Sequence, residues 1–259
     1  MTLLSTIETY YDAAPRPTAR VEEVGPFTLF LRRSEHGWPF YARPALGVDL
    51  PLTAAHVEQL RSRQRLLGVP ENLEWVHETT PTLLAAARQA GLQVAECPLL
   101  VLPQGAAPVI PPLRDGLRVA VLAPDSPDLA ATVAAVAAGF ADTDTLEERP
   151  AEPLPELMRE GLLAMAAAYD DRGVVGGGSH SPRGETTELA GIAVLPRARR
   201  QGVGAALTAA LVADARQRGA VTVFLSARDD TVARVYERIG FQRVGTACVA
   251  EPPEAATHS

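Results

Sequence analysis

The segment from Pro103 to Gly116, PQGAAPVIPPLRDG, limits the folds open to this chain more than any other stretch. It contains four prolines and two glycines. Proline lacks a backbone donor and has a fixed φ, so such a segment can form neither a helix interior nor a central strand. We therefore interpret it as a linker and predict two domains, at residues 1–112 and 113–259.

The same order of elements is predicted on both sides of this linker. Helices alternate with short strands, at 52–67, 73–77, 80–90 and 92–102 in the first half and at 203–218, 221–226, 229–240 and 241–250 in the second. In each half a glycine, Gly91 or Gly240, ends the second helix. The agreement in order and length indicates an internal duplication. Strand and helix alternation is also common in α/β proteins without duplication.

The remaining part of the second half predicts further strands and helices. The strands are expected at 117–122, 162–169, 174–180 and 186–194, and the helices at 128–141 and 154–161. Together these elements predict an α/β fold, with a central mixed β-sheet flanked by helices in each of two tandem domains.

Composition excludes several classes of protein. The net charge of −7 argues against a nucleic-acid binder that follows phosphates. No apolar run reaches the roughly 18 residues of a membrane span. The two cysteines, Cys97 and Cys248, and the five scattered histidines form neither a disulfide framework nor a zinc pattern. We therefore expect a cytoplasmic protein without a metal and without membrane or nucleic-acid partners.

The motif RARRQGVGAAL, which begins at Arg197, places Gly202 and Gly204 in the first turn of a helix. Glycine weakens a helix, so a physical gain should offset it. First-turn N–H groups lack partners within the helix and carry the positive end of its dipole. Bare backbone there fits a phosphate, with Arg199 and Arg200 at the rim. The alternative is close packing of helix on strand, for which glycine gives clearance.

Two motifs in this order resemble the GNAT acetyltransferase superfamily, over roughly residues 117–251. One family signature, Gln/Arg-x-x-Gly-x-Gly/Ala at a helix start, is matched by RRQGVG at 199–204. The other has Asn, an apolar residue three positions on, Tyr at seven and Gly-Phe at eleven and twelve. Here it reads Asp229, Val232, Tyr236, Gly240 and Phe241. Asp replaces the usual Asn, and Val the usual Ala.

The resemblance implies acetyl-CoA as co-substrate and direct transfer of its acetyl group to an amine. Its pyrophosphate would lie on the backbone N–H groups of residues 200–205, and its pantetheine arm would pair with the strand that ends at 194. The cofactor-binding residues that the resemblance implies are Ile192, Ala193, Val194, Arg199, Arg200, Gln201, Gly202, Val203, Gly204, Ala205 and Asp229. The strand at 186–194 and the next strand would splay apart to admit the thioester.

Two catalytic residues are candidates. A carboxylate can deprotonate the acceptor amine, and Glu188 is the first candidate, with His180 second. Glu188 is equally interpreted as a solvated strand residue. Tyr236 matches the family tyrosine that protonates the leaving thiolate, and its alternative role is packing, on one apolar helix face with Val232, Val235 and Ile239.

The first half lacks these motifs. On the register of the duplication, Ala87 takes the place of Tyr236, and Thr80 that of Asp229. Before the helix at 52–67 the sequence VDLPLTAA has no Arg-x-x-Gly-x-Gly, and Pro51 lies where bare N–H groups would be needed. We therefore expect a degenerate GNAT-like domain. This domain could supply one more strand, which the family usually has at the end of the fold and which the second half lacks.

Several questions stay open at this point. The acceptor is a small-molecule or peptide amine of unknown identity, and the chain is a monomer or a homodimer. A non-catalytic acyl-CoA-binding regulatory or interaction module is the alternative to an enzyme. A third interpretation is a structural α/β protein whose glycines serve packing only.

Overall fold

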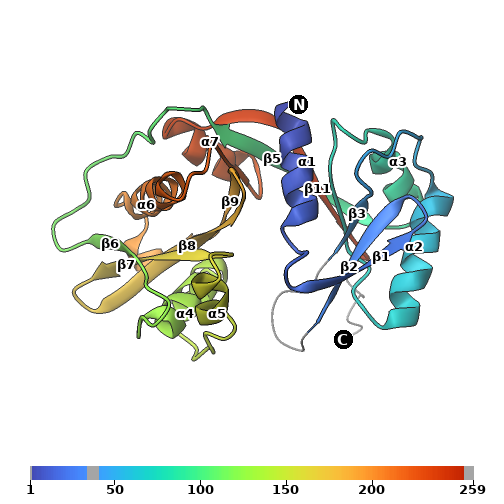
Figure 1. The fold of residues 1–259 in the computed structure, drawn as a ribbon. Helices are drawn as coiled ribbons and strands as arrows, with labels where there is room; N and C mark the ends of the chain where they lie inside the picture. The colour runs from blue at the N-terminus through green and yellow to red at the C-terminus, as the bar shows by residue number, and fades with distance from the viewer. Residues whose placement is uncertain (1, 34–40, 254–259) are drawn as a thin grey trace. The chain divides into compact units, whose positions relative to one another are not determined.

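The computed structural model describes residues 2–33 and 41–253 (Figure 1). By internal contacts the chain divides into two compact units. Unit 1 consists of the residues up to Leu99, 226–230 and the residues from Val244 onward, and unit 2 consists of Leu100–Leu225 and Thr231–Arg243. Each unit therefore contains segments from both halves of the sequence.

Unit 1 has a mixed sheet with helices. Its strand order is β1-β2-β3-β4-β11-β5. The β3–β4 pair is parallel and the β4–β11 pair antiparallel. The elements are α1 Leu3–Ala13, β1 Ala19–Val24, β2 Phe27–Arg32, β3 Ala42–Pro44, α2 Ala54–Leu67, β4 Leu73–Val76, α3 Thr82–Gln89, β5 Gln93–Leu102 and β11 Gln242–Glu251.

Unit 2 holds the glycine motif. Its strand order is β5-β10-β9-β8-β7-β6, where β5 reaches unit 2 through Leu100–Leu102. The β9–β10 pair is parallel, and the pairs from β6 to β9 are antiparallel. The elements are β6 Arg118–Val121, α4 Leu129–Phe140, α5 Leu154–Arg159, β7 Ala164–Asp170, β8 Gly173–Arg183, β9 Thr186–Val194, a 3-10 turn Pro196–Ala198, α6 Val203–Gln217, β10 Thr222–Ser226 and α7 Asp230–Arg238.

Consecutive glycines in β8 let helices approach both faces of this sheet. A Cβ on Gly177 would lie 2.4 Å from Thr132 Cγ2 of α4, and a Cβ on Gly178 would lie 3.2 Å from Leu211 Cδ1 of α6. Neighbouring strand residues point to opposite faces, so α4 and α6 cover opposite faces of the sheet (Figure 1). A side chain on Gly177 would collide with α4, whereas one on Gly178 would collide with Ile192 of β9, 2.7 Å away, and press tightly on α6.

The predicted fold class is confirmed, and every element of the duplicated pattern is present within about two residues of its expected bounds. The elements α1, β1, β2 and β3 precede this pattern in the chain. We expected the second half to lack a final strand of its own. In the structure, the two halves of the sequence exchange strands. The last strand of the second half, β11, lies in unit 1 beside β4, while the end of β5 from the first half lies in unit 2 beside β10.

Candidate active site

The first turn of α6 is open. Gly202 precedes the helix in the left-handed conformation, with φ +83°. The first helical hydrogen bond runs from Ala206 N to Gly202 O at 3.0 Å. No side chain caps this end in the part of the chain that the structure describes. The backbone N–H groups of residues 203–205 therefore lack protein acceptors there and point out of the helix start.

Glycine is required at position 202 by the backbone conformation, whereas the protein's own structure does not require it at position 204. Gly202 needs its positive φ, and a Cβ there would lie 3.4 Å from Pro111 Cγ. Gly204 is helical, and nothing lies within 4 Å of the position of an added Cβ. The packing interpretation requires a close neighbour at each glycine, and Gly204 has none among the described residues. Helix packing therefore does not explain Gly204.

Beside this turn, β9 separates from its parallel neighbour. The β9–β10 ladder contains three residue pairs, the last of which joins Phe224 to Glu188. β9 continues to Val194, and its register with β8 shifts near Gly191, which has φ +64°. Within the described chain, residues 189–194 thus have no ladder partner on the β10 side. The predicted splay is present, and it leaves an extended strand edge for a ligand.

The three strand residues implied in cofactor binding lie along this edge. Ala193 is buried, whereas Ile192 and Val194 are half-buried. A Cβ on Gly139 of α4 would lie 3.1 Å from Ala193 Cβ, and a Cβ on Gly178 would lie 2.7 Å from Ile192 Cγ1. Contacts with α4 and with β8 therefore hold this part of β9 in place although its other edge is unpaired.

The two arginines at the rim differ in their contacts. Arg199 is bound to other parts of the protein, and Arg200 is exposed. Arg199 donates from Nε to Val194 O at 3.0 Å and from Nη2 to Gly139 O at 2.7 Å, and it pairs with Asp142. Its guanidinium therefore ties β9 to the end of α4, and the expectation that it adds free charge at the rim is not met. Arg200 is exposed, with φ +59°, and makes no side-chain hydrogen bond or ion pair among the described residues. Gln201 Nε2 donates to Arg197 O at 3.0 Å.

Tyr236 of α7 is half-buried and packs edge-to-face on Phe241, with 5.9 Å between the ring centroids. Burial raises the pKa of its hydroxyl to about 12, so the group is a proton donor at neutral pH. The prediction that Val235 shares a packed apolar face with Tyr236 is wrong, because Val235 is 48% exposed. Asp229, directly before α7, pairs with Arg228 at 3.2 Å.

The two candidate bases have different surroundings. Glu188 is half-buried and forms the last pair of the β9–β10 ladder. Thr187 Oγ1 lies 3.1 Å from His180 Nδ1, and because strand residues alternate, Glu188 belongs to the opposite face of the sheet, the α4 face. Glu188 therefore lies where the two strands begin to separate.

His180 is fully buried, and its Nε2 lies 2.8 Å from Asp214 Oδ2. Burial lowers the pKa of this imidazole, against the opposing effect of Asp214. Asp214 also accepts from Arg218 Nε at 2.5 Å. The second candidate base is therefore wrong, because both ring nitrogens are engaged and the ring has no access to solvent. The sequence analysis did not predict this cluster, and Asp214, a carboxylate that interrupts the apolar stripe of α6, is the signal that could have indicated it.

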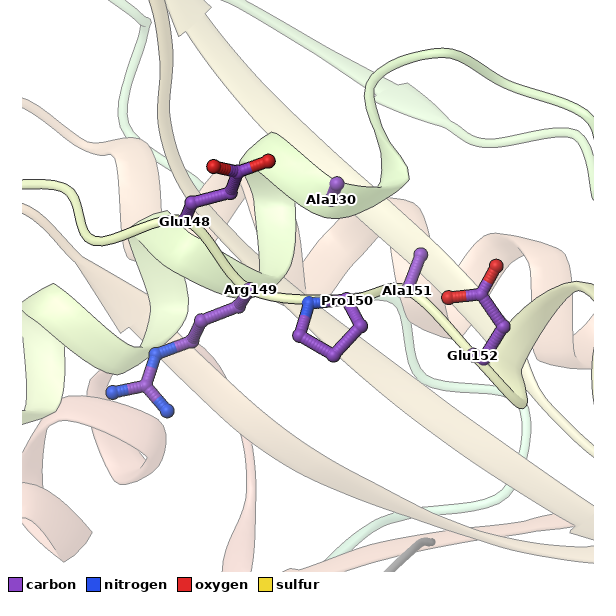
Figure 2. A pocket seen from close by; sticks show the side chains of 6 residues that line it. All are labelled: Ala130, Glu148, Arg149, Pro150, Ala151 and Glu152. Carbon is purple, nitrogen blue, oxygen red and sulfur yellow. The ribbon is translucent and has the colours of Figure 1, made fainter.

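A hollow of about 480 Å³ lies elsewhere in unit 2 (Figure 2). Its lining consists of Ala130, Glu148, Arg149, Pro150, Ala151 and Glu152. Ala130 is at the start of α4, about 13 Å along the helix from Gly139 at its other end. The hollow is therefore separate from the splayed strands.

Metal-binding and membrane-spanning features are absent from residues 2–33 and 41–253, the described residues. They contain no group of three or more His, Cys, Asp or Glu side chains that could hold a metal ion. No helix among them has both the length and the apolar character needed to cross a membrane.

Residues 135–241 match the acetyltransferase (GNAT) family. This range contains β9, β10, α6 and α7, and with them the open turn, the splayed edge, Glu188 and Tyr236. The predicted resemblance to this family is confirmed over these residues. The chain is therefore an enzyme of the acyltransferase class, and the chemistry of that class is acetyl transfer.

Solved structures share the fold. A GCN5-related N-acetyltransferase from Kribbella flavida is 24% identical, with 99% of this chain and 98% of that chain covered and a TM-score of 0.76. A conserved protein of unknown function from Staphylococcus epidermidis is 17% identical, with coverages of 90% and 93% and a TM-score of 0.59. A tandem GNAT protein from the clavulanic acid biosynthesis pathway is 17% identical, with coverages of 88% and 79% and a TM-score of 0.55. No curated protein matches the sequence.

Proposed function

We propose that this chain is an acetyl-CoA-dependent N-acetyltransferase that transfers the acetyl group directly to an amine. The observation that carries the proposal is the open first turn of α6. Gly204 has no neighbour that would exclude a side chain, and the turn lies inside the region that matches an acetyltransferase family. A bare helix start with unpaired N–H groups suits a phosphate.

In this proposal the diphosphate of acetyl-CoA accepts hydrogen bonds from the N–H groups of residues 200–205. Arg200 supplies the positive charge at the rim, since the guanidinium of Arg199 is already bound to Val194 O and Gly139 O. The pantetheine arm pairs with the free edge of β9 at residues 192–194. N–H groups of this edge can also polarise the thioester carbonyl, because they are fixed before the substrate binds.

Two proton transfers accompany the acetyl transfer. Glu188 accepts a proton from the acceptor ammonium, since only the neutral amine has a lone pair for attack. The amine nitrogen then forms a bond to the acetyl carbon while the bond from that carbon to sulfur breaks. The nitrogen gives up its second proton to solvent as the neutral amide forms. Tyr236 gives its hydroxyl proton to the leaving thiolate and regains from solvent the proton that it donates. Its raised pKa of about 12 keeps the proton on the oxygen until the thiolate forms.

We also propose that residues 1–112 are a degenerate GNAT-like domain and that residues 113–259 hold the cofactor. Helix α2, the counterpart of α6, has a closed N-terminus. Thr53 Oγ1 accepts from His56 N at 3.4 Å, and His56 Nδ1 accepts from Thr53 N at 3.2 Å. The N–H groups that α6 leaves free are thus partly used in α2, which supports one cofactor site per chain.

In unit 1, the parallel strands β3 and β4 correspond to β9 and β10 of unit 2 and pair only at Ala42 and Leu73. The space beyond this pair is filled by side chains. Arg43 on β3 is fully buried and forms an ion pair with Glu8 of α1. Glu8 Oε1 in turn accepts from Val76 N of β4 at 3.2 Å and from Thr79 Oγ1 at 2.6 Å. In unit 2 the corresponding gap between β9 and β10 is open at residues 189–194. A thioester would have to displace a buried ion pair from unit 1 to occupy its gap.

The acceptor is a small-molecule or peptide amine, and we expect a cytoplasmic monomer or homodimer. Calorimetric titration of the full chain with acetyl-CoA tests the cofactor site. We expect one site for the wild type and no binding for Gly202→Glu, which places a negative charge at the phosphate position. Gln217→Glu, at the other end of the same helix, is the control and should bind like the wild type. Unchanged binding by Gly202→Glu would remove the assignment.

Turnover is measured separately from binding. Release of free CoA thiol in the presence of a panel of amines is expected for an acetyltransferase. Binding of acetyl-CoA without turnover of any amine would favour the regulatory or interaction module instead.

A further inference from the structure

The linker between the two halves of the sequence is packed onto unit 2. Val109 N donates to Ile239 O, directly after α7, at 3.0 Å. A Cβ on Gly240 would lie 4.0 Å from Ala107 O and 3.8 Å from Leu102 Cδ1. The first part of the linker is therefore fixed at the C-terminal end of α7.

The next residues of the linker reach the start of α6. A Cβ on Gly202 would lie 3.4 Å from Pro111 Cγ, 3.5 Å from Pro112 O and 3.7 Å from Pro111 O. In Figure 1 this green connection between β5 and β6 runs past α6. Two consecutive prolines restrict the backbone here, because each has a fixed φ. The segment therefore approaches the open turn as a stiff piece of chain.

The segment borders the open turn without closing it. The side of Gly202 faces Pro111 and Pro112, whereas the side of Gly204 has nothing within 4 Å. The N–H groups of residues 203–205 remain without protein acceptors among the described residues. A phosphate on these groups would thus have the helix start on one side and the two prolines on another.

We propose that residues 103–116 form a strap that is the outer wall of the phosphate end of the cofactor site and slows the release of acetyl-CoA. The inference rests on the proposed function, since it concerns the same site. Pro111 and Pro112 act as positioning residues that hold the strap beside Gly202. The bond from Val109 N to Ile239 O couples the strap to α7, the helix that carries Tyr236.

The test compares Pro111→Gly/Pro112→Gly with Pro127→Gly in the full-length chain. Pro127 is an exposed proline in the loop before α4, so it controls for the general effect of a proline-to-glycine change on the unfolded chain. Stopped-flow displacement of bound acetyl-CoA by excess CoA gives the dissociation rate. We expect the double variant to release acetyl-CoA about tenfold faster than the wild type, since affinity differences among variants appear mostly in this rate. Pro127→Gly should match the wild type.

Amide hydrogen exchange gives a second readout that does not depend on turnover. We expect acetyl-CoA to slow exchange in residues 104–110 of the wild type, and much less in the double variant. Equal dissociation rates for all three proteins, or unchanged exchange in the strap on binding, would overturn the inference. If the wild type itself binds no acetyl-CoA, the proposed function fails first. Circular dichroism spectra of the variants establish that each is folded.

Discussion

Replacing Gly204 separates a packing role of the α6 glycines from a ligand-binding role. Gly204 is in the first turn of the helix, and an added Cβ would meet nothing within 4 Å. Alanine favours a helix over glycine by about 0.5–1 kcal/mol. We therefore expect Gly204→Ala to raise the free energy of unfolding of the ligand-free protein by about 0.5–1 kcal/mol.

Gly202→Ala is the matched change with the opposite sign. Gly202 has φ +83°, and its added Cβ would lie 3.4 Å from Pro111 Cγ. The left-handed conformation costs an L-residue roughly 1–2 kcal/mol. The two single-methyl additions, two residues apart, should therefore differ in unfolding free energy by roughly 1.5–3 kcal/mol.

A larger side chain at Gly204 tests whether the diphosphate of acetyl-CoA occupies the open space beside this residue. Leucine has nearly the helix propensity of alanine, so Gly204→Leu should leave the ligand-free protein at least as stable as the wild type. Its side chain would fill the space proposed for the diphosphate, and we expect acetyl-CoA affinity to fall at least about tenfold, or 1.4 kcal/mol. Gly204→Ala should retain most of the affinity, since the family signature accepts alanine at this position.

Thermal unfolding with and without acetyl-CoA measures these effects. One kcal/mol corresponds to a shift of about 2–4 °C in Tm for chains of about this size. A lower Tm for ligand-free Gly204→Ala would refute the reasoning, because it would mean that the turn is packed and that glycine is explained without a ligand. Wild-type affinity in Gly204→Leu would show that the open space does not hold the cofactor.

Three further predictions concern proton transfer and pH. Tyr236→Phe should lower kcat by about 10²-fold or more with little change in acetyl-CoA affinity, and wild-type turnover would make Tyr236 a packing residue. Glu188→Gln should lower kcat by about 10²–10⁴-fold, and activity equal to the wild type would exclude it as the base. The pKa of buried His180 is lowered from 6.5, so the unfolded state binds more protons below that pH. Urea unfolding should therefore show stability falling as the pH drops below 6.5, with a shallower fall in His180→Gln, and equal slopes would contradict this.

Local signals in the sequence predicted the helix boundaries well. The helix expected at 52–67 is α2, whose start is capped by the hydrogen bond from His56 N to Thr53 Oγ1 and whose end is marked by Gly68 with φ +65°. The glycines of the α6 turn were equally visible. Each of these features depends on the conformation of a few neighbouring residues, so a short stretch of sequence is enough to specify it.

Side-chain roles at the site depended on long-range contacts and were predicted less well. Arg199 reaches Gly139 O across 60 positions of sequence, and His180 meets Asp214 across 34. Val235 follows the helical periodicity of an apolar face but is exposed. Periodicity places a residue on one side of its own helix, whereas the partner that covers that side is set by packing.

The sequence by itself determined the fold class, most of the order of helices and strands, the resemblance to the family and the open turn at Gly202 and Gly204, because periodicity, turn chemistry and motif spacing are local. The tertiary structure alone decided that β11 pairs with β4, that the end of β5 lies beside β10, and that β9 leaves β10 after Glu188. A strand offers the same backbone donors and acceptors to any neighbour, so its own sequence does not specify which strand pairs with it.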